Sequence, residues 1–126
     1  GFDEFVRSRK DTELRRQNHP GELRVSQLVP AVEYLQANRI RMLLMEEVAR
    51  AMEGIDVLVS PWRSINPLTS MTGHPVVVVP NGFTGEVTPT GIAFMGSIYR
   101  EDKLLMLAKA YQEATGFHER HPVLRA

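Results

Sequence analysis

The chain lacks cysteine, which excludes disulfide bonds, thiolate metal sites and a cysteine nucleophile. It also lacks an excess of either charge, since 15 Lys and Arg balance 15 Asp and Glu. Nucleic-acid-binding domains usually carry a basic excess on one face, so this balance argues against direct binding of nucleic acid. No apolar run approaches the roughly 20 residues that span a bilayer, so we expect no membrane segment. The absence of Cys fits a cytoplasmic location, which we expect.

The length and composition of the chain suit a folded globular protein. The chain has 126 residues, of which 43% are hydrophobic and 24% are charged. This length suits one domain or a piece of a larger one. We therefore expect residues 1–126 to form a single domain or a fragment.

Three short apolar runs, each bounded by Gly or Pro, predict strands. They are residues 56–60, 76–79 and 92–95. Near-continuous apolar runs of this length are typical of strands that are buried on both faces. The connection between the second and third runs begins at Asn81-Gly82, which predicts a turn and an antiparallel pair. Residues 62–72 are rich in Ser, Thr, Asn and Pro and are expected to form a loop.

The flanking regions predict helices. Residues 2–17 carry mixed charge with sparse apolar anchors, which favours a solvated helix that His19-Pro20-Gly21 breaks. A second helix is expected from Ser26 or Pro30 to Glu53, with Gly54 as its stop. A third is expected from Arg100 to Ala114 and is closed by Thr115-Gly116. The tail, residues 117–126, is expected to be a surface strap anchored by Phe117 and Val123.

These elements predict an α/β fold in which helices pack on a small mixed sheet. Strands buried on both faces need cover on both, and three helices offer little of it. An edge strand of such a sheet would be bare. The sequence therefore predicts a missing partner, which is either the rest of a longer chain or a second copy.

No complete catalytic site is expected within the chain. Serines and lysines are present, yet none lies in a Gly-x-Ser-x-Gly elbow or a Ser-x-x-Lys pair. The residues considered as nucleophiles or bases are Ser60, Ser64, Ser70, Ser97, Lys10, Lys103 and Lys109.

Metal and cofactor sites are also not expected. His118 and His121 stand three residues apart with Glu119 between them, but an exposed tail is a poor place to hold three converging ligands. His74 precedes Pro75 at a strand entrance, where we expect it to bond a loop carbonyl. No glycine-rich phosphate loop is present.

Trp62 is the single tryptophan and follows a strand end. Two interpretations stay open for it. Loops at the carboxyl ends of strands often line sites in α/β proteins. Alternatively, the ring covers the core.

Several segments together resemble the C-terminal portion of the amidase signature family. They are Pro30–Arg39, Asp56–Pro61 and the block Thr72-Gly73-His74-Pro75 with the valines and Asn81-Gly82 that follow. Within that family, the sequence is similar to amidases that are like the A subunit of glutamyl- or aspartyl-tRNA amidotransferases. The closing residues Gly96, Glu101, Leu104, Leu105 and Ala108 also follow the pattern, so the resemblance covers about residues 30–122.

The resemblance implies an enzyme that hydrolyses carboxamides or transfers their ammonia. Such enzymes use a Ser nucleophile, a second Ser on a cis peptide, a Lys base and a backbone oxyanion hole. Those catalytic residues belong to an upstream segment that nothing here matches. We therefore assign no catalytic residue to this chain and expect it to be inactive alone. The family fold is α/β/α around a large mixed sheet, which would supply the missing cover.

The resemblance also implies a pocket for a small amide, with Trp62, Ser70 and Thr72 as its candidate lining residues. Three departures from the family pattern bear on the substrate. Ser70 stands where the family has Asn, Ala93 stands where many members have Gln, and the loop from Pro61 to Ser70 is short. The alternative function is a non-enzymatic dimerisation or docking module built on the same fold.

Overall fold

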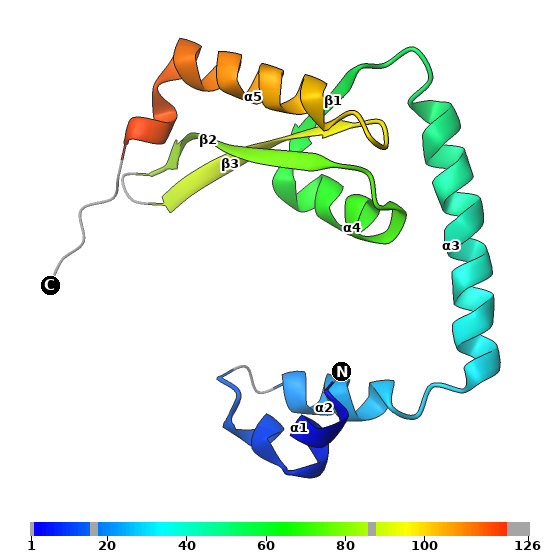
Figure 1. The fold of residues 1–126 in the computed structure, drawn as a ribbon. Coiled ribbons are helices and arrows are strands. Elements are labelled where there is room, and N and C mark those ends of the chain that lie inside the picture. The colour runs from blue at the N-terminus through cyan, green and yellow to red at the C-terminus, as the bar shows by residue number, and fades with distance from the viewer. Residues whose placement is uncertain (1, 16–17, 86–87, 121–126) are drawn as a thin grey trace, which may run out of the picture. The chain divides into compact units, whose positions relative to one another are not determined.

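The structure, a computed structural model, describes residues 2–15, 18–85 and 88–120. Its contacts divide the chain into two compact units, Gly1–Ile40 and Arg41–Ala126. The elements of the first unit are α1 (Asp3–Arg7), η1 (Lys10–Glu13), α2 (His19–Ser26) and the start of α3 (Ala31–Ala51). The second holds the rest of α3, then β1 (Val57–Pro61), α4 (Trp62–Thr72), β2 (Val76–Thr84), β3 (Thr88–Gly96), α5 (Glu101–Thr115) and η2 (Phe117–Glu119) (Figure 1).

The second unit is built on a three-stranded sheet in the order β1-β3-β2. Both pairings are antiparallel, with Val57 opposite Gly96 and Val76 opposite Met95. The predicted α/β class, with helices packed on a small sheet, is confirmed, as is the antiparallel pairing of β2 with β3. The predicted mixed character is wrong for the described sheet, because both of its pairings are antiparallel. The last strand in sequence thus lies in the middle of the sheet.

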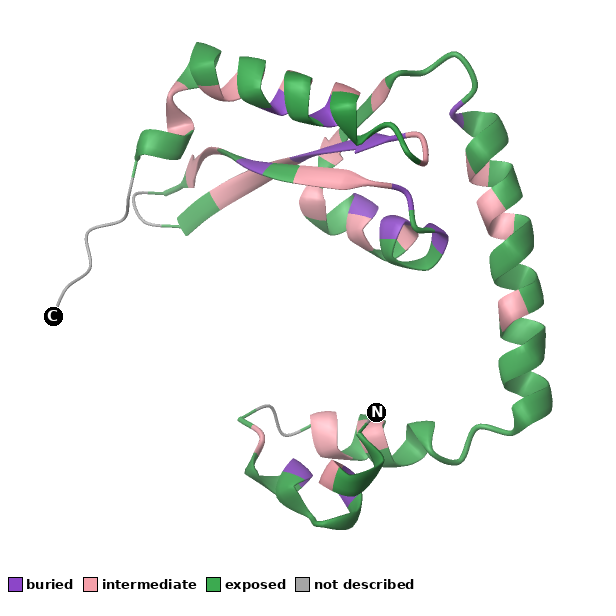
Figure 2. Ribbon diagram, viewed as in Figure 1, coloured by how far each residue is buried: buried purple, intermediate pink, exposed green. Residues whose placement is uncertain are grey.

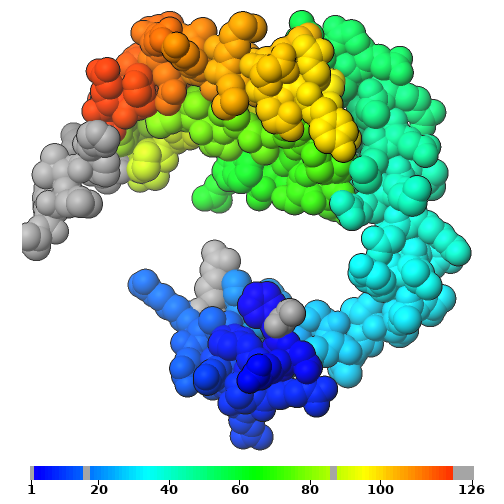
Figure 3. Space-filling model, viewed as in Figure 1, coloured from blue at the N-terminus to red at the C-terminus, as the bar shows by residue number. Residues whose placement is uncertain are grey.

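Helices cover both faces of β3 (Figure 1). Ala93 and Met95 point to one face and pack with Ile65 of α4 and with Met52. Phe94 points to the other face and packs with Leu104 and Ala108 of α5 and with Val79 of β2. Successive side chains of a strand point to opposite faces, so one strand supplies both cores. Figure 3 shows α5, in orange, lying against the green strands. The expectation of a strand buried on both faces is correct for β3.

Gly96 allows α5 to approach the end of β3 closely. A Cβ atom added at Gly96 would lie 3.1 Å from both Cγ and Cδ2 of Leu104, which is 1% exposed. Contacts that short would push the side chain or the helix outward. Leu105, the next residue of this helix, is exposed.

The first unit contradicts the prediction of one helix over residues 2–17. The chain leaves α1 at Ser8, and Arg9 takes a left-handed conformation with φ of 60°. The reason is tertiary, because Asp11 is fully buried and accepts a hydrogen bond from Arg24 Nε of α2 at 2.8 Å. A straight helix would not place Asp11 there.

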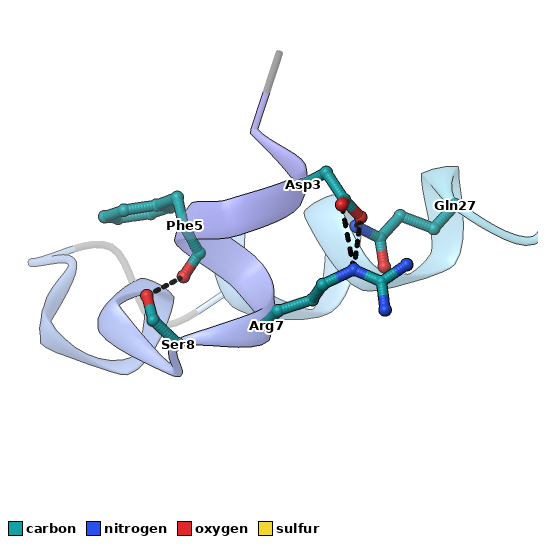
Figure 4. A network of polar contacts seen from close by, with 5 residues as sticks. All are labelled: Asp3, Phe5, Arg7, Ser8 and Gln27. Atoms are coloured by element: carbon teal, nitrogen blue, oxygen red, sulfur yellow. Dashed lines mark hydrogen bonds and ion pairs between the residues drawn. The ribbon is translucent and has the colours of Figure 1, made fainter.

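His19-Pro20-Gly21 begins α2 rather than breaking a helix, so that prediction was also wrong. Proline is well tolerated in the first turn, where its missing N–H would be unpaired in any case. The two helices of this unit are joined on the surface by Asp3, which accepts from Arg7 Nε at 2.8 and 2.9 Å and from Gln27 Nε2 at 3.2 Å (Figure 4).

α3 follows Pro30 and stops before Gly54, whose φ of 76° is left-handed, as predicted. None of its 21 residues is buried, and Figure 2 shows it green along most of its length. Val48 packs against the core of the second unit, and Arg41 Nε donates to Met71 O at 2.5 Å. Ile40 of the same helix is 66% exposed.

α4 replaces the loop that was expected over residues 62–72, so that prediction was wrong. Its buried positions are Ile65, Thr69 and Thr72, at helical spacing. The two threonine hydroxyls donate to carbonyls within the helix, Thr69 to Asn66 O at 3.2 Å and Thr72 to Leu68 O at 2.9 Å. These bonds let polar residues face the core. Gly73, with φ of 76°, ends the helix.

The described part of the tail forms η2, and Val123, the second expected anchor, lies outside the described residues. Among the described helices, none is both long and apolar enough to cross a membrane.

Candidate functional site

A β-bulge in β2 borders a hollow in the second unit. Pro80 lies opposite Gly91 and Gly82 lies opposite Thr90, so Asn81 is an extra residue without a partner on β3. The predicted turn at Asn81-Gly82 is therefore wrong, because β2 runs on to Thr84. Gly82, with φ of 127°, supplies the backbone conformation that the bulge requires.

The hollow next to this bulge, called here the bulge hollow, has a volume of about 830 Å³. Its wall comes from the end of β1, the start of α4, the bulge of β2 and the start of β3. Apolar and polar groups share this wall, and they include Val59, Ser60, Trp62, Arg63, Asn81, Thr90 and Ile92. A mostly apolar hollow with a few polar groups is typical of small-molecule sites.

Asn81 carries the only polar side-chain atom of this wall that is sealed from solvent without a hydrogen-bond partner among the described residues. That atom is Oδ1. A buried carbonyl oxygen that lacks a donor is unfavourable by about 1–3 kcal/mol. Such atoms in a folded protein call for an explanation, for which a bound water or ion and a catalytic role are standard candidates.

Trp62 is the first residue of α4 and follows directly on β1. Its half-buried side chain packs against the cluster of Met52, Ile65, Ala93 and Met95, and it also lines the bulge hollow. The ring therefore covers the core, as one of the two interpretations expected, and it also borders a hollow.

Ser70 and Thr72 lie near the other end of α4, about 12 and about 15 Å along the helix from Trp62 at about 1.5 Å per residue. Ser70 is exposed, and its Oγ donates to Asn66 Oδ1 at 3.2 Å. Thr72 is fully buried. The structure does not bring these three candidate lining residues together at the bulge hollow.

His74 contacts Thr72 rather than the expected loop carbonyl. The Thr72 hydroxyl donates its hydrogen bond to Leu68 O. Because its single hydrogen is used there, it accepts a hydrogen bond from His74 Nδ1 at 2.9 Å. This assigns the proton of the neutral imidazole to Nδ1. His74 is only 4% exposed, and this burial lowers the pKa of its imidazole.

A second, smaller hollow of about 310 Å³ lies where α3 ends and α5 begins. Both of its cations are paired, Lys103 with Asp56 and Arg100 with Asp102. The hydrogen bond from Lys103 lowers the pKa of the exposed Asp56. Paired charges of this kind leave little for an incoming anion to bind.

Among residues 2–15, 18–85 and 88–120, no serine nucleophile and lysine base are brought together. The serine hydroxyls there that form hydrogen bonds donate to carbonyl oxygens, and no serine is bonded to a lysine amine. A Ser nucleophile needs a base within hydrogen-bond reach. Within the same part of the chain, no three His, Cys, Asp or Glu residues converge as a metal site would need. His118 lies in η2, and His121 lies outside the described residues.

Asn81 and Arg63 were not singled out from the sequence. Asn-Gly is a common turn pair, so its place within a strand is visible only when β3 pairs with β2. The valine run before Pro80 was the available signal. A strand that begins there can continue past Pro80 if a β-bulge accommodates Asn81 as the extra residue.

Comparison with known proteins finds relatives of this chain that are named as the A subunit of glutamyl-tRNA(Gln) amidotransferase. The Microcystis aeruginosa protein of this name is 34% identical over 110 residues, covering 71% of this chain and 23% of that protein. The one from Nostoc punctiforme is 30% identical, covering 88% of this chain and 27% of its own length. The one from Synechococcus elongatus is 29% identical and covers 98% of this chain. No family model matches the chain.

These relatives confirm the resemblance stated from the sequence and are consistent with a C-terminal portion of an amidase-signature protein. The chain spans between 23% and 31% of the length of the curated relatives described above. The match to the Synechococcus elongatus protein runs over 147 residues, more than the 126 of this chain. That relative therefore has residues within the matched region that this chain lacks.

Proposed function

We propose, from the premise that most of this chain is homologous to a part of the A subunit of glutamyl-tRNA(Gln) amidotransferase, that residues 1–126 act as the C-terminal piece of an amidase-signature enzyme. The parent enzyme would hydrolyse a carboxamide or transfer its ammonia through its own Ser, cis-Ser and Lys. This piece would complete the sheet and form one wall of the acyl pocket. It would be inactive alone, with no cofactor and no metal.

The observation that carries this proposal is the small share of the relatives that the chain covers, together with its uncovered apolar surface. The amino-terminal half of α3 exposes Val32, Leu35 and Ile40 by 57–66%, and Leu43 by 60%. Contiguous exposed apolar residues usually mark a surface that another body covers. We propose that the rest of the amidase chain covers this helix.

A first test measures turnover by the isolated chain. Ammonia release from glutamine, acetamide and benzamide should equal that of buffer, because no serine in the described residues has a lysine base. Turnover above buffer that disappears when Ser60, Ser64, Ser70 or Ser97 is changed to Ala would show that the chain carries a nucleophile after all.

A second test measures binding to the proposed cover. The probe is the Microcystis aeruginosa relative without its matched segment, co-expressed with this chain and purified through a tag on the probe. The double variant Leu35→Glu/Leu43→Glu should reduce co-purification at least about tenfold. Gln36→Glu, at an exposed position of the same helix, is the matched control and should leave it unchanged. Equal recovery of both variants would contradict the proposed contact.

In the pocket of the parent enzyme, Trp62 is proposed as a lining residue because its ring borders the bulge hollow. Ser70 and Thr72 are kept as proposed lining residues on the basis of the family resemblance alone. The substrate would be a small amide. A cytoplasmic location is proposed as well, since the relatives are named for a reaction on tRNA.

The alternative function is a non-enzymatic module that pairs with a second copy. It is favoured by the strand order, because β1 and β2 both lie at edges of the described sheet, with Val59 51% and Val78 43% exposed. Sedimentation of the pure chain separates the two functions. A discrete dimer over a tenfold range of concentration supports the module, whereas a monomer that aggregates supports a piece of a larger enzyme.

A further inference from the structure

We infer that β1 is the edge at which a strand of the amidase remainder joins this sheet, through the backbone groups of Val57 and Val59. The amidase remainder is the part of the proposed parent enzyme that lies outside residues 1–126. This inference rests on the proposed function and deepens it, because it names the contact edge and the hydrogen-bonding groups that form it.

β1 has the residue pattern of a central strand but lies at an edge. Its run Val57-Leu58-Val59 is continuously apolar, which is typical of a strand that is covered on both faces. In the described sheet, β1 pairs with β3 alone. Leu58 is 37% exposed and Val59 is 51% exposed. Successive side chains of a strand point to opposite faces, so apolar surface is open on both sides of β1.

The pairing of β3 with β2 shows in which direction each residue of β3 forms its backbone hydrogen bonds. The N–H of Gly96 donates to the carbonyl oxygen of Pro75 at 3.1 Å, so Gly96 bonds toward the β2 side. The bonding direction alternates along the middle strand of an antiparallel sheet. Met95 and Ala93 therefore bond toward β1.

The register then shows which groups of β1 point away from β3. Leu58 and Ser60 lie opposite Met95 and Ala93, so their backbone groups bond to β3. Val57 and Val59 direct their N–H and C=O groups outward. The proline that ends β1 falls at the next outward position, where its missing N–H takes nothing from the pairing with β3. An incoming strand can therefore pair with both outward valines.

The opposite edge of the sheet, β2, carries features that protect an edge strand. By the same alternation its outward positions include Val78 and Pro80, and a proline offers no N–H to a further strand. The bulge at Asn81 follows directly, and bulges twist an edge away from further pairing. η2 also packs on β2, and Arg120 Cζ lies 5.2 Å from the centre of the Phe83 ring just after the bulge. β1 is therefore the edge that remains open to a partner.

The occupant of the β1 edge is a strand of the amidase remainder. The relatives extend well beyond the matched region, since this chain covers between 23% and 31% of their length. Pairing with a second copy is a weaker explanation. Two five-residue strands meet over about 17 Å, at about 3.3 Å per residue. That edge is too short for the roughly 1,200 Å² that a stable interface buries.

Hydrogen exchange of the unaltered chain tests the edge without any substitution. In the isolated chain, the amides of Val57 and Val59 should exchange at least about tenfold faster than those of Leu58 and Ser60. The probe for binding is the Microcystis aeruginosa relative without its matched segment. Its addition should slow exchange at Val57 and Val59 at least about tenfold and leave Val78, on the other edge, unchanged.

A proline substitution at the same edge provides the second test. Val59→Pro removes an outward N–H and should fold, because that N–H takes no part in the pairing with β3. It should lower co-purification with the tagged probe at least about tenfold, through the lost hydrogen bond and the bulk of the ring. Val78→Pro is the matched control, since it removes an outward N–H at a position of β2 that is 43% exposed. It should leave co-purification unchanged, and a circular dichroism melt checks that both variants fold.

Separate results would overturn the inference and the proposed function. A probe that co-purifies while the amides of Val57 and Val59 stay unprotected keeps the proposed function and overturns the inference. Equal recovery of Val59→Pro and the unaltered chain, or equal losses in both proline variants, also overturns it. A discrete dimer of the isolated chain with both amides already protected assigns the edge to a second copy instead. No recovery of the probe by the unaltered chain overturns the proposed function, and the inference with it.

Discussion

At the residue scale, His74 and Thr72 form a buried polar pair at the entrance to β2. The Thr72 hydroxyl donates a hydrogen bond to the carbonyl oxygen of Leu68 and accepts one from Nδ1 of His74. Both residues are at most 4% exposed. A charged imidazolium in this place would lose solvation with no acid opposite it among its described hydrogen-bond partners.

The first prediction concerns the pH dependence of stability. Burial lowers the pKa of His74 in the folded chain below the ordinary value of 6.5, so the unfolded chain binds more protons between the two values. The free energy of unfolding should therefore rise with pH through that window and fall as pH drops below about 6.5. Urea unfolding at pH 5, 6 and 7 should show a steeper loss for the unaltered chain than for His74→Gln.

His118→Gln is the control for this prediction, because His118 is exposed in η2. It should keep the pH slope of the unaltered chain. Parallel curves for His74→Gln and the unaltered chain would show that His74 does not contribute to the slope.

At the element scale, α4 both packs on the core of the second unit and borders the bulge hollow. One side of the helix packs Ile65 into the core cluster with Met95, and its first residue, Trp62, borders the bulge hollow. The helix therefore positions the hollow through its packing on β3. Loosening that packing should affect the stability of the whole second unit.

The second prediction follows from this packing. Ile65→Ala should lower the free energy of unfolding by about 2–4 kcal/mol, because Ile65 is 5% exposed and the change leaves a cavity. Ile55→Ala removes the same atoms at a position that is 43% exposed and should cost less than about 1 kcal/mol. Chemical denaturation measures both, and equal losses would contradict the assignment of Ile65 to the core.

The third prediction concerns the first unit, where Arg24 is the partner of the buried Asp11. Arg24→Leu would leave that carboxylate buried without its hydrogen bond, at a cost of about 2–4 kcal/mol. This cost is below that for a fully buried pair because Arg24 is 50% exposed. Amide signals of residues 3–26 should lose dispersion while those of β3 stay in place.

Arg7→Leu is the matched control for the third prediction. Its ion pair with Asp3 is largely exposed, with side chains 77% and 65% accessible. Exposed pairs contribute between zero and about 1 kcal/mol. If both variants behave alike, the Asp11–Arg24 bond does not organise this unit.

Much of the fold could be predicted from the sequence, because its signals are local. Apolar runs bounded by Gly or Pro predicted the strands. Gly54 and Gly116 marked helix ends, and both have a left-handed backbone. α4 was missed because Ser, Thr and Asn suggest a loop until their hydroxyls find helix carbonyls. Trp62 was placed correctly at a strand end. Asn81 was missed because its bulge depends on pairing with Gly91 and Thr90, which is not a local property.

At the scale of the whole chain, apolar surface is distributed unevenly. β3 contributes Ala93, Phe94 and Met95, each at most 3% exposed, whereas α3 buries no residue. Local stability follows buried contacts and protected hydrogen bonds. The two elements should therefore open with very different free energies.

The fourth prediction measures this difference by hydrogen exchange. Amides of Ala93 to Met95 should exchange most slowly, since β3 has strands on both sides and helices on both faces. Amides of residues 32–40 should exchange at least about a hundredfold faster in the isolated chain. Addition of the amidase remainder should slow the second group selectively. Equal protection of both groups in the isolated chain would mean that α3 is covered by the chain itself.

The position of β3 between β1 and β2 also dictates when this sheet can form during synthesis. The first two strands have no ladder bonds to each other and meet only through the third. A nascent polypeptide that has been made as far as Thr84 holds two strands with no shared partner. Residues 88–96 must emerge before either strand is paired, so the assembly of this layer waits until β3 has been synthesised.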